Sequence, residues 1–133
     1  MNSIMYEYLF LLTCKFLNPQ SSINEKKSDY VEEALNYIES NYCDPITIQD
    51  IANHLNINRS YLHRLFKTYT GFSIQTYLLD YRIRQACILL KTTSLSVRII
   101  AHSVSYADPL YFSKLFHQKK GLSPSEYRKQ IQE

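Results

Sequence analysis

Two stretches of the sequence carry polar and basic side chains at the spacing of one helix face, where positions i, i+3, i+4 and i+7 are neighbours. The residues are Ser60, His63, Arg64 and Lys67 in the first stretch, and Leu110, Ser113, Lys114 and His117 in the second. In a DNA major groove, Arg and Lys reach guanine acceptors, Ser and His pair with base edges, and Leu contacts a thymine methyl group. The alternative is that each stripe is an ordinary solvated helix face.

The two stripes belong to an internal repeat. YLHRLFKTYTGFSIQTY (61–77) and YFSKLFHQKKGLSPSEY (111–127) place Tyr, Leu, Phe, Gly, Ser and Tyr at matching positions. Two stripes in one register, each preceded by a short helix and a turn, favour a shared function over two unrelated solvated faces.

Hydrophobic periodicity and capping residues predict an all-α chain. A polar, Pro-containing linker (18–28) precedes a helix that starts at Asp29, capped with Glu32, and ends near Asn41. Helices are also expected after Thr47, from 59 to 70, from 73 to about 91, after Ser96, from 109 to 120, and after Ser123. Apolar residues that should face inward are Leu62, Leu65, Phe66 and Tyr69 in the first stretch, and Phe112, Leu115 and Phe116 in the second. The short helix capped by Ser96 carries Val97, Ile99, Ile100, Ala101 and Val104.

Each repeat has the pattern of a helix-turn-helix unit, the first at about 47–70 and the second at about 96–120. Ala52 and Ala101 lie where the two helices of each unit would cross. The helix over 73–91 is apolar around much of its girth, which predicts a central linker packed at both ends. Its length of about 28 Å is close to the roughly 34 Å between successive major-groove faces, so one chain could present both units to one duplex.

Charge is divided unevenly along the chain. Residues 29–50 carry six acids and no Lys or Arg, whereas residues 59–129 carry twelve bases and three acids, a net charge of +9. This asymmetry indicates a polyanionic partner. The three cysteines and four histidines show no metal-ligand spacing, and no nucleophile–base pair or phosphate loop is present, so we expect no enzyme, metal or cofactor.

Residues 1–28 begin with an apolar run that lacks the preceding positive charge of an export signal and is too short to span a bilayer. We expect an amphipathic helix and a cytoplasmic protein without membrane contact. The helix offers two alternatives, a homodimerisation face through Tyr8, Leu9, Leu12 and Phe16 or packing on its own domain.

The sequence resembles the AraC/XylS family of bacterial transcription regulators. The matching stretches are PITIQDIA (45–52), YLHRLFK (61–67), YRIRQACILL (81–90) and DPLYFSKLFHQKKGLSPSEYR (108–128), together with Gly71. The resemblance covers about 29–133 and implies a homeodomain-like, seven-helix DNA-binding domain that binds double-stranded promoter DNA and acts through RNA polymerase. It assigns base reading to Ser60, His63, Arg64, Leu110, Tyr111, Ser113 and Lys114.

Phosphate contacts are expected from Arg59, Lys67, Lys119 and Lys120, and the resemblance adds His117, where the family usually has a basic residue. Ser105 departs from the glycine usual at the family's second turn. Residues 1–28 are interpreted as a remnant of an effector or dimerisation domain, and no small-molecule effector site is evident.

Other interpretations remain open. Arg82 is expected to make a structural ion pair with Glu39 or Asp80 rather than contact DNA. A basic protein-interaction module, or a non-specific DNA binder without regulatory activity, is the alternative to a sequence-specific regulator.

Overall fold

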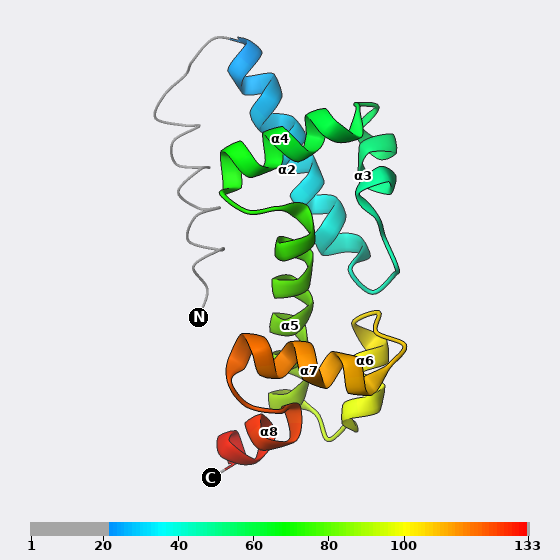
Figure 1. The fold of residues 1–133 in the computed structure, drawn as a ribbon, viewed down its shortest axis with the longest axis vertical. Helices are drawn as coiled ribbons and strands as arrows, with labels where there is room; N and C mark the ends of the chain where they lie inside the picture. Colours follow the sequence, from blue (N-terminus) through cyan, green and yellow to red (C-terminus); the bar gives the residue numbers. More distant parts are fainter. Residues whose placement is uncertain (1–21, 133) are drawn as a thin grey trace. The chain divides into compact units, whose positions relative to one another are not determined.

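The structure is a computed structural model that describes residues 22–132. Seven helices follow one another along the chain (Figure 1): α2 (Ser22–Asn41), α3 (Ile48–Leu55), α4 (Arg59–Thr70), α5 (Ile74–Thr92), α6 (Val97–Ser103), α7 (Pro109–Lys120) and α8 (Pro124–Gln132). No strand occurs in this part of the chain, and the predicted all-α fold is confirmed. The predicted N-terminal helix, with its dimerisation face, lies outside the described residues.

Helix α2 begins earlier than the sequence suggested. It starts at Ser22, so Asp29 lies inside the helix and the predicted linker over 18–28 is wrong for its last seven positions. The segment after Pro19 contains no Gly or Pro, and its Glu and Lys residues are good helix formers. The polar composition of this segment therefore does not break the helix.

Side-chain caps fix several of the other helix starts. At α3, the Asp50 amide donates to Thr47 Oγ1 (3.1 Å) and the Thr47 amide donates to Asp50 Oδ2 (2.8 Å), a reciprocal capping box. At α8, the Ser123 amide donates to Glu126 Oε1 (3.0 Å) and the Glu126 amide to Ser123 Oγ (3.2 Å). Both starts lie where the sequence placed them.

The chain forms two compact units, and the first contains residues 22–40 and 46–77 of the described chain. Its buried apolar residues come from α2 (Val31, Ala34, Leu35, Ile38), α3 (Ile48, Ile51, Ala52, Leu55), α4 (Leu62, Leu65, Phe66) and the start of α5 (Ile74, Tyr77). Tyr69, which was predicted to face inward, is half-buried, and its neighbour Thr70 is buried. The Thr70 hydroxyl donates to the Phe66 carbonyl at 2.7 Å, and this bond allows a polar side chain to enter the core.

The second unit contains residues 41–45 and 78–132. Its core is formed by Ile83, Ala86, Cys87 and Leu90 of α5, Ile100, Ala101 and Val104 of α6 or its end, and Phe112 and Phe116 of α7. Leu115 is partly buried, and Ile99 is 50% exposed. Ile100, Ala101 and Val104 fill the core side of the short α6, and Ile99 points about 100° away from Ile100 around the helix axis.

The two helix-turn-helix units differ by one residue in the turn. Helices α3 and α6 begin 49 positions apart, whereas α4 and α7 begin 50 positions apart. In both turns an amide bonds back to the buried alanine of the first helix: Ile57 to the Ala52 carbonyl (3.1 Å) and Tyr106 to the Ala101 carbonyl (2.8 Å). The turns therefore match up to Ile57 and Tyr106, and Ala107 is the extra residue.

Both turns also pass through a left-handed residue, Asn56 (φ 57°) in the first and Ser105 (φ 73°) in the second. Asn tolerates this conformation because its short polar side chain bonds locally, whereas Ser is less well suited to it. The positive φ expected at Ser105 is confirmed.

Replacing Ser105 by Gly should raise the free energy of unfolding by about 0.5–1 kcal/mol, because Gly adopts positive φ without a Cβ clash. Ala107→Gly is the matched control in the same turn. Its φ is not positive, so it should lower stability through the entropy of the unfolded chain. Urea unfolding of both variants measures the difference, and an equal loss in both would contradict strain at Ser105.

Candidate nucleic-acid interface

The predicted stripe on α4 forms the outward face of the first unit. Ser60, Arg64 and Lys67 are exposed and His63 is half-buried, whereas Leu62 on the opposite face is fully buried. The burial pattern follows from the helical period, because residues three or four apart share a face. The stripe is therefore available to a partner along the length of α4.

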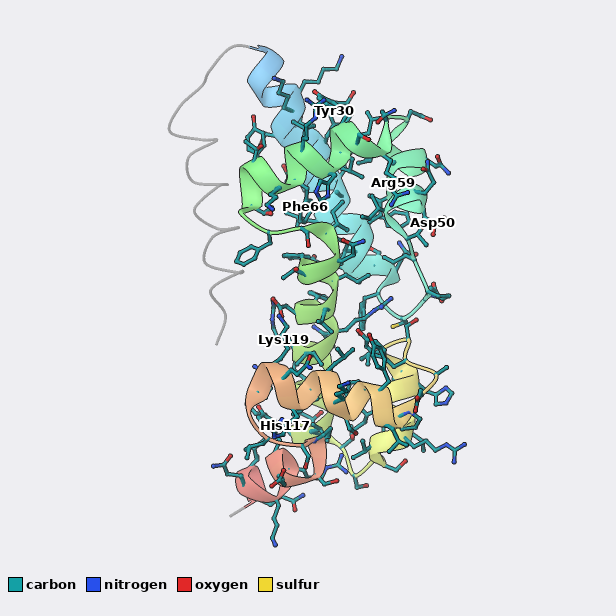
Figure 2. The ribbon with its side chains drawn as sticks, viewed as in Figure 1. Tyr30, Asp50, Arg59, Phe66, His117 and Lys119 are labelled. Atoms are coloured by element: carbon teal, nitrogen blue, oxygen red, sulfur yellow. The ribbon has the colours of Figure 1, made fainter. Side chains whose placement is uncertain are left out.

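Helix α4 begins at a hollow of the first unit that is lined by both polar and apolar surface. The hollow is lined by Ile48, Arg59, Ser60, His63, Arg64 and Gln75. The Asn58 side-chain oxygen caps the helix by accepting the Ser60 amide at 2.8 Å. Two guanidinium groups, an imidazole and a capped helix start suit an anionic group such as a phosphate. Figure 2 labels Arg59 at this end of α4.

The Arg64 side chain in this hollow contacts an aromatic ring. Its guanidinium carbon lies 5.9 Å from the centroid of the Tyr61 ring, one turn earlier on the same helix. A cation–π contact of this kind is worth about 0.5–1 kcal/mol at an exposed site and restricts the side chain. Arg64 is thus exposed and also partly oriented.

The stripe on α7 is more apolar at its start. Leu110 is 81% exposed and Tyr111 is 53% exposed, while Ser113 is half-buried and Lys114 is exposed. Asp108 caps the helix by accepting the Leu110 amide at 3.0 Å. Two large apolar side chains at the capped start of a helix present surface that suits methyl groups and sugar rather than water.

The basic residues assigned to phosphate differ in their environments. Arg59 lies at the start of α4, Lys67 in its last turn, and His117, Lys119 and Lys120 in the last turn of α7. Figure 2 labels Arg59, His117 and Lys119. Lys119 Nζ lies 3.1 Å from Asp80 Oδ1, with both side chains partly covered. A phosphate would have to compete with this carboxylate, so Lys119 is the weakest of the five candidates.

The burial of Arg82 agrees with the structural role expected for it; the ion pair expected with Glu39 or Asp80 stays a prediction, and Asp80 Oδ1 lies 3.1 Å from Lys119 Nζ. Arg82 is 8% exposed and donates to the carbonyl oxygens of Tyr42 (2.9 Å) and Asp44 (2.8 Å). These carbonyls follow the end of α2, where the helix no longer supplies partners. Sequence spacing could not reveal a partner that lies about forty positions away.

Sequence reasoning also missed Gln75 and Ile48, which line the hollow with the predicted residues. Gln75 lies in the first turn of α5, two positions after Ser73, whose hydroxyl accepts the Thr76 amide at 3.1 Å. The repeat contained a signal for the helix that carries Gln75. Ser73 and Ser123 are matching cap positions, and each begins a helix soon after a stripe ends.

Comparison with known proteins agrees with this geometry. A family model described as a helix-turn-helix domain matches residues 51–130. A solved transcriptional regulator from Chromobacterium violaceum, described as containing an AraC-type DNA-binding domain, is 30% identical, with a TM-score of 0.74 over 80% of this chain and 96% of that one. The chain belongs to the AraC family of DNA-binding domains.

Two regulators resemble this AraC-type domain over nearly its whole length. The Msm operon regulatory protein of Streptococcus mutans is 38% identical over 96% of this chain and 46% of its own. The raffinose operon transcriptional regulatory protein of Pediococcus pentosaceus is 37% identical over 98% and 47%, respectively. The AraC-type domain thus spans just under half the length of these relatives.

The family consists of transcription regulators, which confirms the prediction of a non-enzymatic function. In the described part of the AraC-type domain, no group of three or more His, Cys, Asp or Glu side chains could hold a metal ion. Among the helices over 22–132, none is long and apolar enough to cross a membrane.

The stability of the last helix of the AraC-type domain should depend on pH through the charge of Glu126. The backbone amide and the hydroxyl of Ser123 both bond to the carboxylate and lower the pKa of Glu126 below its usual value. A lowered pKa in the folded state stabilises the fold above the ordinary Glu range, and this contribution is lost as the pH falls through the folded-state pKa.

We therefore expect Glu126→Gln to lower the urea midpoint at pH 7 and to have a progressively smaller effect as the pH falls through the lowered pKa of Glu126. Asp44→Asn, an exposed substitution in the same unit, is the control and should show no such pH-dependent difference. A Glu126→Gln effect of equal size across this pH range would contradict a role for the charge.

Proposed function

We propose that the domain binds promoter DNA in a sequence-specific manner, with α4 and α7 in successive major grooves. The main support is the pair of outward stripes. Each lies on a helix with a capped start, in matching register, within a segment of net charge +9. A polyanion with readable edges is the ligand that this combination suits best.

In the first unit, we assign base reading to Ser60, His63 and Arg64. Arg64 is exposed and partly oriented by Tyr61, so it can present its paired donors to a guanine. Ser60 and His63 are the shorter donors and acceptors beside it on the same hollow.

In the second unit, we assign base reading to Leu110, Tyr111, Ser113 and Lys114. Leu110 and Tyr111 supply apolar contact for thymine methyl groups, and Ser113 and Lys114 supply hydrogen bonds. The two units would therefore prefer different base pairs, with polar recognition in one and mainly apolar recognition in the other.

Phosphate contacts fall to Arg59, Lys67, His117 and Lys120, and to Lys119 if its pair with Asp80 opens. Helix α5, which begins in the first unit and continues in the second, has 19 residues and a length of about 28 Å. This length supports two reading helices on one duplex, since successive major-groove faces lie about 34 Å apart.

For the whole protein, we propose a bacterial cytoplasmic regulator that controls an operon through contact with RNA polymerase. Two relatives carry operon regulation in their descriptions, one of them for raffinose. A homodimer through the N-terminal helix remains a proposal of the same kind.

Selection of random duplex DNA against the purified chain at two salt concentrations tests this function. We expect an enriched site with two blocks about one helical turn apart. One block alone would restrict base reading to a single unit. Binding that falls steeply with salt and shows no enrichment would contradict sequence-specific binding, and a basic protein-interaction module or non-specific binder would replace it.

Arg64→Ala should cost about 1–3 kcal/mol on the selected site and relax the preference at one base position. Lys67→Ala, one turn later on the same helix, is the matched control. It should weaken binding to all sequences about equally and reduce the salt slope by about one. Equal losses on all sequences from Arg64→Ala would show that Arg64 contacts phosphate instead of bases.

A further inference from the structure

We propose that Arg82 and Tyr106 are positioning residues that orient Tyr111 on α7 and thereby set the base preference of the second unit. Neither residue belongs to the outward stripe, and Arg82 is almost completely buried. The proposal rests on the proposed function and extends it from the residues that face DNA to those that support them.

The support starts at Arg82. Its Nε and one terminal nitrogen donate to the carbonyls of Tyr42 (2.9 Å) and Asp44 (2.8 Å), and these two bonds fix the plane of the guanidinium. The guanidinium carbon lies 5.5 Å from the centroid of the Tyr106 ring. A cation held in place by two carbonyls therefore attracts and orients the ring beside it.

Tyr106 in turn contacts and restricts side chains at the start of α7. Its amide is tied to the Ala101 carbonyl at 2.8 Å, and its ring lies 5.7 Å from the Phe112 ring in the core. The Tyr106 ring also meets the Tyr111 ring edge-on, with centroids 6.3 Å apart and an interplanar angle of 60°. Burial raises the pKa of the Tyr106 phenol, against the opposing effect of Arg82, so the side chain stays neutral at physiological pH.

Tyr111 needs such support because it is 53% exposed. A side chain with so little cover samples several rotamers, and binding must then restrict it at an entropic cost. Aromatic and cation–π contacts change a conformational equilibrium roughly 3–10-fold each. A fixed Tyr106 ring can therefore favour one rotamer of Tyr111 before DNA is bound.

The first unit provides an internal comparison. The position that matches Tyr106 is Ile57, which makes the same amide bond to the preceding alanine. Ile57 has no aromatic ring, and the second turn is longer by one residue, Ala107. The aromatic support is thus a property of the second unit, and its loss should affect only the second block of a DNA site.

The test measures affinity for the selected duplex and for versions with either block scrambled, using the full chain. We expect Tyr106→Leu and Arg82→Lys to lower discrimination at the second block roughly 3–10-fold and to leave the first block unchanged. Arg82→Lys retains the charge but loses the fork that binds two carbonyls. Tyr106→Phe keeps the ring and its contacts with Tyr111 and Phe112 but loses the hydroxyl that bonds to Arg82, so it should lower discrimination less than Tyr106→Leu.

Coupling to Tyr111 separates positioning from a general structural role. In a Tyr111→Ala background, Arg82→Lys should cause no further loss at the second block, because the residue that it positions is absent. Additive losses, or equal losses at both blocks, would overturn the proposal. If Tyr106→Leu fails to fold, the comparison of Arg82→Lys and Tyr106→Phe with and without Tyr111→Ala still decides it.

Failure of the proposed function would give a different experimental result from failure of the positioning role. A wild-type chain that binds selected and scrambled duplexes equally would refute base reading itself, and the positioning role with it. Normal wild-type discrimination that Tyr111→Ala lowers but Arg82→Lys leaves intact would refute the positioning role alone.

Discussion

Helices α4 and α7 each follow a shorter helix that carries a fully buried alanine. Ala52 and Ala101 are fully buried, and the amide of the residue after each left-handed turn bonds back to the alanine carbonyl. A larger side chain at either position would separate the two helices, since protein interiors are close-packed. This constraint directs one face of α4 and α7 into the core and leaves the other face for a partner.

The two units share the same helix-turn-helix arrangement but present different surfaces. In the first, a polar cap and a hollow surround Arg59, His63 and Arg64. In the second, Tyr106, Tyr111 and Phe112 form a group of neighbouring rings at the start of α7. The divergence lies at the helix starts, where side chains meet a partner, and not at the buried positions that maintain the crossing.

The sequence predicted the helix ends best where a cap or a glycine defines them. The capping boxes at Thr47 and Ser123 and the left-handed glycines Gly71 and Gly121 lie at the expected positions, because these signals act within three or four residues. The start of α2 was wrong because exposed helix and polar linker share a composition. The periodic pattern also predicted the outward stripes, although it did not predict that Thr70 is buried.

The sequence by itself determined the all-α fold, the repeat and the two faces of each reading helix, because helical periodicity and capping are local properties. Only the tertiary structure decided that Arg82 binds two carbonyls about forty positions away and that Lys119 pairs with Asp80. It also brought Gln75 beside Arg64. Such partners are set by how the helices pack, because packing brings together side chains that are distant along the chain.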